Sequence, residues 1–269
     1  MNYPTSLLKE ELIENIISDC DPDMSDKALQ FYRHFFEEYF DETQKLNPYY
    51  RGDCINSLGW TFGVNNKDGA FKANARSYTR LFTEEDIELF YQFRKGYHSK
   101  SNFIILPREL NIWRGEYRER DNDNSGHGTC DYFDILLSLI RKYYFQESMS
   151  TRMRNYVDPY KNWLNTYGYG ESGWRTFIKR NYLMPFVNEE YLVKDIFADN
   201  SSYKSNECNE LVGKHHDFDW CLPRSRCSNN GEEIPLSTAK ERAVNYMKNS
   251  LWIWEERANI LLAQHNNHK

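Results

Sequence analysis

The stretch NFIILPRELNIWRGEY, residues 102–117, decides the fold class, because the other regular patterns in the chain are helical. Residues 102–107 form a short apolar run of β-type side chains that ends at Pro107, which predicts a strand. Residues 109–117 could form its hairpin partner. A further short strand is expected near residues 55–65, where Gly and Asn lie at turn spacing. The sequence therefore predicts a small antiparallel sheet.

Helical patterns occupy most of the remaining chain, with apolar side chains spaced three or four residues apart and charges between them. The expected helices cover residues 5–19, 25–41, 83–95, 130–145, 148–167, 172–184, 188–197 and 237–264. Expected N-terminal caps are Ser25, Thr83, Asn188 and Thr238. Thr83 and Thr238 are each followed three positions later by an acidic residue, the spacing of a capping box. The final HNNHK is typical of a polar, fraying end.

Together these patterns predict an α+β protein that is predominantly helical and has a small antiparallel sheet. Residues 1–269 are expected to form a single domain, with residues 198–236 as a polar excursion or insertion. The length of 269 residues suits one large domain or two small ones, and the pattern shows no domain boundary before residue 198.

Charge and composition narrow the class of protein. The net charge of −6 argues against non-specific nucleic-acid binding, because proteins that coat nucleic acids are usually basic. The first residues do not form a secretory leader, and no window approaches the roughly 18 apolar residues of a membrane helix. The six cysteines are scattered, which suits reduced thiols. We therefore expect a cytoplasmic protein without a membrane partner.

Nucleotide-binding, hydrolase and metalloprotease signatures are absent from the sequence. We find no phosphate-binding P-loop, no dinucleotide fingerprint after a strand, no nucleophile elbow and no His-Glu-x-x-His pair. The motifs leave open whether the protein is an enzyme, and they predict no cofactor.

The loop RERDNDNSGHG, residues 118–128, supports two interpretations. Arg118 and Arg120, with His127 beside a Gly-rich turn, could form an anion site at the start of the next helix. Alternatively, the acidic residues interspersed among them could neutralise the loop and leave it solvated, with weak surface ion pairs. The second interpretation is favoured, and it shifts attention to the flanks of the loop.

Residues 141–180 carry eight bases and three acids, a balance of +5, with aromatic residues between them. Such a surface could bind phosphates and stack bases. More often the aromatic residues belong to a core and the bases to a solvated face. The first 45 residues have eleven acids and four bases, a balance of −7, and could dock against this segment.

Cysteine and histidine residues between positions 208 and 227 include the types that bind zinc. They are Cys208, His215, His216, Cys221 and Cys227. The spacing is irregular and lacks a Cys-x-x-Cys pair, so an ordinary loop with free thiols is the favoured interpretation and no metal site is predicted.

The flanks of the loop carry a family resemblance. An apolar strand is followed by Asn111, Arg114 and Gly115 in an Asn-x-x-Arg-Gly-aromatic motif. A helix of Asp-x-Phe-Asp type then begins with Asp131 and Asp134. This order resembles an uncharacterised family of bacterial cytoplasmic proteins. The resemblance implies a helix-rich bacterial cytoplasmic protein, and it implies no particular reaction.

Further pieces extend this resemblance over residues 100–262. Residues 158–183 look like the family's helix–loop–helix, and residues 243–261 look like its C-terminal helix with Arg257 and Asn259. The loop 118–128 and the Cys/His connection look longer than in the family, so His127 and Cys221 are not expected to be shared features.

The leading functional hypothesis is an arginine-lined pocket for an anionic small molecule, such as a nucleotide or another phosphorylated ligand. Arg114 would bind the anion and Asn111 would orient it, because the guanidinium fork matches phosphate and carboxylate geometry. Supporting or pairing residues are expected to be Asp131, Asp134, Arg141 and Arg257. The structural alternative is a buried ion pair between Arg114 and one of the two aspartates.

Two other classes stay open. A non-enzymatic interaction or regulatory protein, such as a toxin-neutralising or defence-associated protein, would use exposed aromatic residues of 156–174 as its interface. An enzyme that acts on nucleic acid would need carboxylates that converge on a metal beside residues 141–180. The net negative charge makes nucleic acid the less favoured partner.

Overall fold

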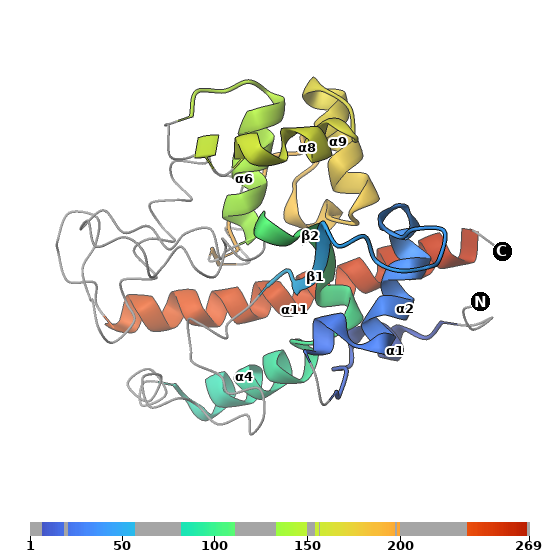
Figure 1. Cartoon of the computed structure of the whole chain (residues 1–269). Helices are drawn as coiled ribbons and strands as arrows, with labels where there is room; N and C mark the ends of the chain where they lie inside the picture. Colours follow the sequence, from blue (N-terminus) through green and yellow to red (C-terminus); the bar gives the residue numbers. More distant parts are fainter. Residues whose placement is uncertain are drawn as a thin grey trace.

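The computed structural model describes residues 7–18, 21–56, 82–110, 133–149, 154–155, 157–196, 198–199 and 236–267. These residues form a mainly helical structure with a two-stranded antiparallel sheet, which confirms the predicted α+β class (Figure 1). Within this part of the chain, no helix combines the length and the apolar composition needed to cross a bilayer.

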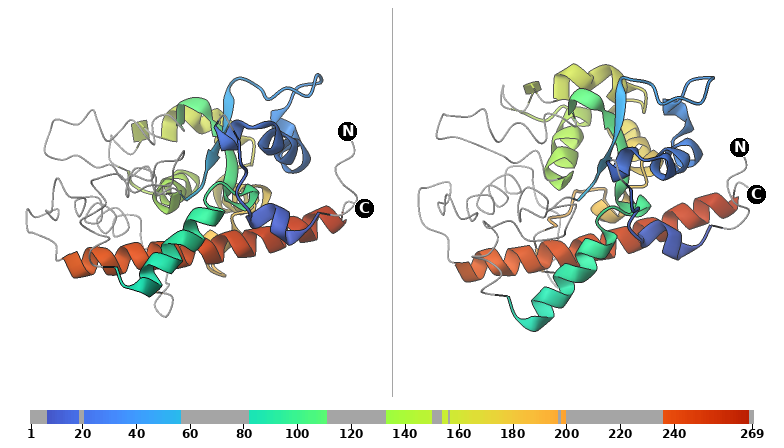
Figure 2. Two further views of the ribbon diagram at one scale, coloured as in Figure 1. Left: turned by 90° about the horizontal axis from the view of Figure 1, so that it is seen from below. Right: turned by 60° about the horizontal axis from the view of Figure 1, so that its bottom comes forward.

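The longest element is the C-terminal helix α11 (Leu236–Asn267), which at 1.5 Å per residue spans about 48 Å. Helix α4 (Glu84–Gly96) crosses it, as both views of Figure 2 show. Phe93 of α4 packs on Trp254 of α11, with 4.8 Å between ring centroids. Gly96 permits this approach, because an added Cβ would lie 2.9 Å from the Trp254 ring.

The sheet pairs β1 (Tyr50–Cys54) with β2 (Phe103–Pro107), so that Tyr50 faces Pro107 and Cys54 faces Phe103. The β2 strand is confirmed, and all five of its residues are buried. Among the described residues, the partner of β2 is β1 and not the predicted segment 109–117. Residues 108–110 are helical, and residues 111–117 lie outside the described residues. The partner strand also precedes the predicted range 55–65, whose residues from 57 onward lie outside the description.

The N-terminal elements pack against the sheet and α11. They are α1 (Lys9–Ile13), the short 3-10 helix η1 (Pro22–Met24), α2 (Asp26–Phe35) and the 3-10 helix η2 (Glu37–Tyr39). The predicted caps are confirmed in two places: Ser25 Oγ accepts from Ala28 N, and Thr83 and Asp86 form a reciprocal capping box. The predicted helix 5–19 is shorter than expected, because residue 15 leaves the helix and bridges residue 99.

A second group of helices lies on the other side of the sheet from α11 (Figure 1). It contains α6 (Phe133–Tyr144), η6 (Asp158–Tyr160), α8 (Lys161–Asn165) and α9 (Gly170–Arg180). The 3-10 helix η7 (Met184–Phe186) follows them and contacts α11. Gly173 of α9 lies so close to Gly168 that an added Cβ would come within 2.6 Å of its carbonyl carbon. Tyr144 of α6 packs against the same position, so a side chain at residue 173 would meet both neighbours.

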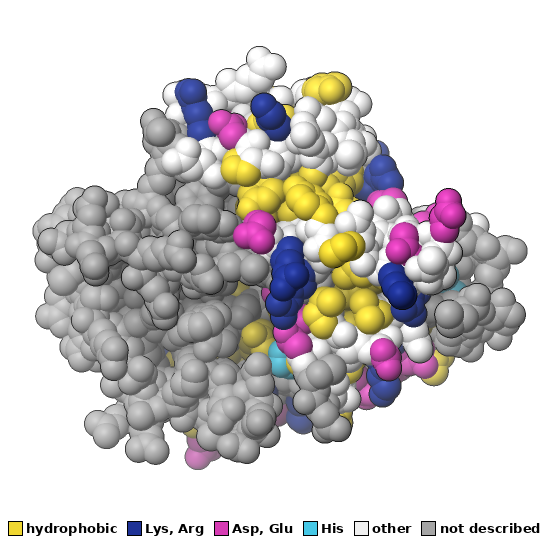
Figure 3. Space-filling model, in the orientation of Figure 1, with side chains coloured by type: hydrophobic (Ala, Val, Ile, Leu, Met, Phe, Trp, Pro, Cys, Tyr) yellow, Lys and Arg dark blue, Asp and Glu magenta, His cyan; other side chains and the backbone are white. Residues whose placement is uncertain are grey.

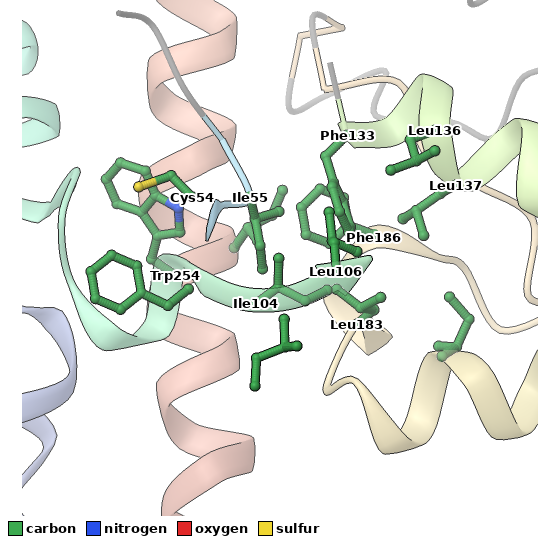
Figure 4. Packing of buried hydrophobic residues seen from close by; sticks show 14 of the residues in the cluster. Cys54, Ile55, Ile104, Leu106, Phe133, Leu136, Leu137, Leu183, Phe186 and Trp254 are labelled. Atoms are coloured by element: carbon green, nitrogen blue, oxygen red, sulfur yellow. The ribbon is translucent and has the colours of Figure 1, made fainter. Parts of the chain in front are cut away.

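The core lies between these two groups, with β2 at its centre. Figure 4 shows Ile104 and Leu106 of β2 directed toward Leu183 and Phe186, with the α6 side chains beside them. Trp254 and Cys54 lie at the opposite end of the strand in the same view. The 3-10 helix η4 (Lys100–Asn102) joins this end to α4.

Three local predictions are wrong in the described residues. Residues 188–196 do not form a helix, because the Asn188 side chain accepts from Glu190 N and Leu192 N and closes a turn. Helix α11 begins at Leu236, so Thr238 lies inside it rather than at its cap. The C-terminal end does not fray at residue 265: its side chain is 4% exposed there and hydrogen-bonds residue 34 over 2.8 Å.

Candidate functional site

The predicted site residues fall into two groups. Asn111, Arg114 and Asp131 lie outside the described residues, as do His127 and the cysteine and histidine residues of 208–227. Asp134, Arg141 and Arg257 are described and lie at three separate places. The residues that flank segment 111–132 are described: Leu110 lies in a helical turn after β2, and Phe133 begins α6.

Asp134 lies in the first turn of α6 and is fully buried. Its Oδ2 accepts from the backbone N of Ile196 over 3.4 Å, and its own carbonyl accepts from Ser138 Oγ over 2.9 Å. A carboxylate in the first turn is favoured by the helix dipole. The Asp134 side chain therefore connects the start of α6 to the backbone at Ile196.

Two further polar residues that the sequence reasoning missed lie in the same region. Asp195 is 1% exposed, and Asn249 of α11 is fully buried. Asn249 Nδ2 donates to the carbonyls of Ile196 and Ala198 over 2.8 Å each. We call Asp134, Asp195 and Asn249 the α6–α11 polar cluster. An asparagine within an apolar helix face was the only sequence signal for it.

The α6–α11 polar cluster presents mainly hydrogen-bond acceptors. It contains two buried carboxylates, and Asn249 Oδ1 is buried and accepts no hydrogen bond within the described chain. Buried carboxylates are stable only when N–H donors or cations face them. The arginine-bearing segment 111–132 ends two residues before Asp134.

Arg141 lies at the other end of α6, about 10 Å along the helix axis from Asp134 at 1.5 Å per residue. Its Nη1 forms an ion pair with Glu147 over 2.6 Å, and its guanidinium lies 4.5 Å from the Phe145 ring centroid. These contacts stabilise the C-terminal end of α6, and they do not bring Arg141 to Asp134.

Arg257 of α11 is fully buried and donates to four backbone carbonyls. Its Nη1 donates to Ser101 O and Phe103 O, both over 2.7 Å. Its Nε and Nη2 donate to Tyr182 O over 3.1 Å and to Asn181 O over 3.2 Å. Burial lowers the pKa of Arg257 from 12.5 to about 9, which leaves it charged at neutral pH. Four of the five N–H donors of an arginine are thus used to join α11, β2 and the end of α9.

Asn102 forms a second buried connection between α11 and the sheet. Its Oδ1 accepts from Asn56 N over 2.9 Å and from Trp254 Nε1 over 2.7 Å. Its Nδ2 donates to Asn56 O over 3.0 Å and to Tyr97 O over 2.7 Å. One amide side chain therefore makes four hydrogen bonds to three residues, two of which, Asn56 and Trp254, are distant in the chain.

The aromatic residues of 156–174 are mostly buried, which contradicts their predicted role as an exposed interface. Tyr160, Trp163, Tyr167 and Trp174 are each at most 7% exposed, and only Tyr169 among the described ones is open, at 75%. Trp174 and Phe177 stack with 6.1 Å between ring centroids. The alternative interpretation, in which these aromatic residues are core, is confirmed.

Several of the bases in residues 141–180 are paired with acids. Arg175 pairs with Glu171 over 2.7 Å, and Arg180 pairs with Glu38 of the acidic N-terminal part over 2.9 Å. Figure 3 shows apolar side chains near the middle of one face, with charged side chains of both signs around them. The described residues therefore show no continuous basic surface on the segment.

Comparison of the chain with protein-family models, with curated proteins and with solved structures finds no match in any of the three. The resemblance to a bacterial family therefore stays a prediction. The described structure defines a mainly helical α+β protein with a buried acidic cluster at the start of α6, and a functional proposal depends on that cluster.

Proposed function

We propose that the protein binds an anionic small molecule, a nucleotide or another phosphorylated ligand, where the α6–α11 polar cluster meets segment 111–132. The observation that supports the proposal most is the complete burial of Asp134 at the start of α6. A buried carboxylate requires a charged or strongly donating partner. Arg114 is the proposed partner, because a guanidinium pairs with a carboxylate through two parallel N–H donors.

The proposed geometry divides the donors of Arg114 between protein and ligand. An arginine has five N–H donors, and a bidentate contact with Asp134 uses two of them. The remaining donors are then held in a fixed orientation toward an anion, which Asn111 orients from the same strand-side motif. Asp131 would share the pairing role. Arg257 would contribute through the joint between α11 and β2, because four of its donors already contact carbonyls.

Arg141 would act at a distance in this proposal, by fixing the far end of α6 through its contact with Glu147. A location in a bacterial cytoplasm is part of the proposal and is supported by the family resemblance and by the scattered cysteines. The competing explanation is that Arg114 and Asp134 form an ion pair with a structural role only.

A thermal-shift experiment tests the proposal. Wild type, Arg114→Ala and the control Arg108→Ala, whose side chain is exposed beside β2, would be heated with ATP, GTP, AMP, pyrophosphate and phosphate. Saturation at 100 times the dissociation constant stabilises a binding protein by about 2.7 kcal/mol. We expect at least one anion to raise the Tm of wild type and Arg108→Ala, and to leave Arg114→Ala unchanged. Identical responses of all three proteins would contradict the proposal.

A further inference from the structure

The 3-10 helix η1 lies between strand β1 and helix α2, away from the α6–α11 polar cluster. Asp23 of η1 is only 8% exposed. Gly52 of β1 packs directly on this turn, because an added Cβ would lie 2.5 Å from both Asp23 O and the Tyr32 hydroxyl. Gly52 N also donates to Met24 Sδ over 3.2 Å. A change at Asp23 is therefore transmitted to β1 and α2 at once.

The carboxyl of Asp23 has mostly acidic neighbours. Asp53 of β1 and Asp21 at the start of η1 both act on it, and Asp21 lies within hydrogen-bonding reach. Arg51 is the cation that acts on Asp23, and it is already paired with Asp21 over 2.8 Å. Burial is the largest cause that favours the protonated form of Asp23, and the charges of Asp53 and Asp21 add to it.

The neighbouring side chains of Tyr32 and His98 do not stabilise a charge on Asp23 either. Tyr32 of α2 is fully buried, and within the described residues neither its hydroxyl nor Asp23 Oδ1 has a hydrogen-bond partner. Burial, followed by the charge of Asp23, raises the pKa of the Tyr32 hydroxyl, so it stays neutral. Burial also lowers the pKa of His98, which interacts with Asp21, to about 4, so His98 supplies no charge at neutral pH.

We propose that Asp23 is a pH-sensitive switch in the fold: its neutral carboxyl keeps η1 packed between β1 and α2, and its ionisation loosens that packing. The interaction that changes is the charge repulsion between Asp23 of η1 and Asp53 of β1. A neutral carboxyl fits this buried interface, whereas a carboxylate there would lose its hydration and face the like charges of Asp53 and Asp21.

The expected pH dependence of stability follows from the direction in which the pKa of Asp23 is shifted. Burial raises the pKa of Asp23 most, and Asp53 and Asp21 raise it further, from 3.8 to about 9. The folded chain then binds a proton that the unfolded chain has released. Stability from this group is fully present below about pH 4 and is lost progressively as the pH rises toward 9.

Urea unfolding of wild type and Asp23→Asn at pH 5, 6.5 and 8 tests the switch. Asparagine keeps the shape of the side chain and stays neutral. We expect the unfolding equilibrium constant of wild type, relative to Asp23→Asn, to rise by up to about tenfold per pH unit. The variant would therefore be the more stable protein at pH 8. A ratio that does not change with pH would overturn the proposal.

Asp41→Asn is the matched control, because hydrogen bonds from Lys45 and Thr43 lower the pKa of this exposed carboxyl. Its ratio to wild type is expected to stay constant from pH 5 to 8, because this carboxyl is ionised in both the folded and the unfolded chain over that range. A direct measurement keeps the test valid if Asp23→Asn folds poorly. Carbon NMR of the aspartate carboxyls in wild type should show one that titrates far above pH 4, and its assignment to Asp23 supports the switch. Titration of Asp23 near pH 4 would overturn it.

Loosening of the η1–β1 packing has its own measurement. Cys54 of β1 is 4% exposed, so its thiol reports the opening of the strand. Labelling of Cys54, followed by peptide mass spectrometry, should become faster in wild type than in Asp23→Asn as the pH rises from 6 to 9.5. Equal rates in both proteins at every pH would show that ionisation of Asp23 leaves the packing unchanged.

Discussion

Arg257→Met is expected to lower the free energy of unfolding by about 3–5 kcal/mol, the cost of removing one side of a buried charged contact. The substitution keeps the length and the apolar part of the side chain. It removes the donors for four carbonyls, those of Ser101, Phe103, Asn181 and Tyr182. Urea denaturation followed by circular dichroism would measure the loss.

The control for this prediction is Arg175→Met. Arg175 is paired with Glu171, but its side chain is 42% exposed, so the expected loss is far smaller than that for Arg257→Met. Arg257→Lys should behave almost like Arg257→Met, because a lysine has one nitrogen and lacks the planar fork that reaches carbonyls on separate elements. Equal losses for Arg257→Met and Arg175→Met would show that the buried contacts of Arg257 do not hold α11 to β2.

Asn102→Ala is the second substitution with a large expected effect, a loss of about 4 kcal/mol. Each buried donor or acceptor left without a partner costs about 1–3 kcal/mol. This change leaves the N–H and C=O of Asn56, the carbonyl of Tyr97 and the indole N–H of Trp254 without their partner. Thermal and urea unfolding would both report the loss.

Asn165→Ala is the matched control for the second prediction. Asn165 accepts one hydrogen bond from Tyr143 over 2.8 Å at a partly exposed position, so its removal should cost about 1 kcal/mol. A loss for Asn102→Ala no larger than that for Asn165→Ala would contradict a central role for the amide. Trp254→Phe removes a single donor, so its loss of stability should lie between those of Asn102→Ala and Asn165→Ala.

The parts of the fold that the sequence predicted carry local signals. The apolar run of β2, the capping box of α4 and the long apolar stripe of α11 each form within one segment. The β1 strand was missed because Tyr-Arg-Gly-Asp-Cys is short and contains a glycine and two charged residues, and its burial depends on a partner strand far along the chain. The Asn188 turn was misassigned because its side chain bonds the backbone two and four residues on.

The site was predictable to a lesser degree. Asp134 was selected because it follows the loop at the start of a helix, and it is indeed buried there. Asp195, Asn249 and Asp23 were missed, because their burial results from contacts between segments and leaves little trace in a single sequence. Arg257 was selected for ligand binding, and its described contacts are with backbone carbonyls of the core.

We propose that Asp134 holds Arg114 in position to bind an anion. Isothermal titration of pyrophosphate into wild type, Arg114→Met, Asp134→Asn and the double variant tests it most directly. A charge-assisted hydrogen bond contributes about 1.5–3 kcal/mol, so each single variant should bind roughly 10-fold to 150-fold more weakly. The double variant should bind no more weakly than Arg114→Met. Independent, additive losses, or affinities equal to wild type in all variants, would contradict the claim.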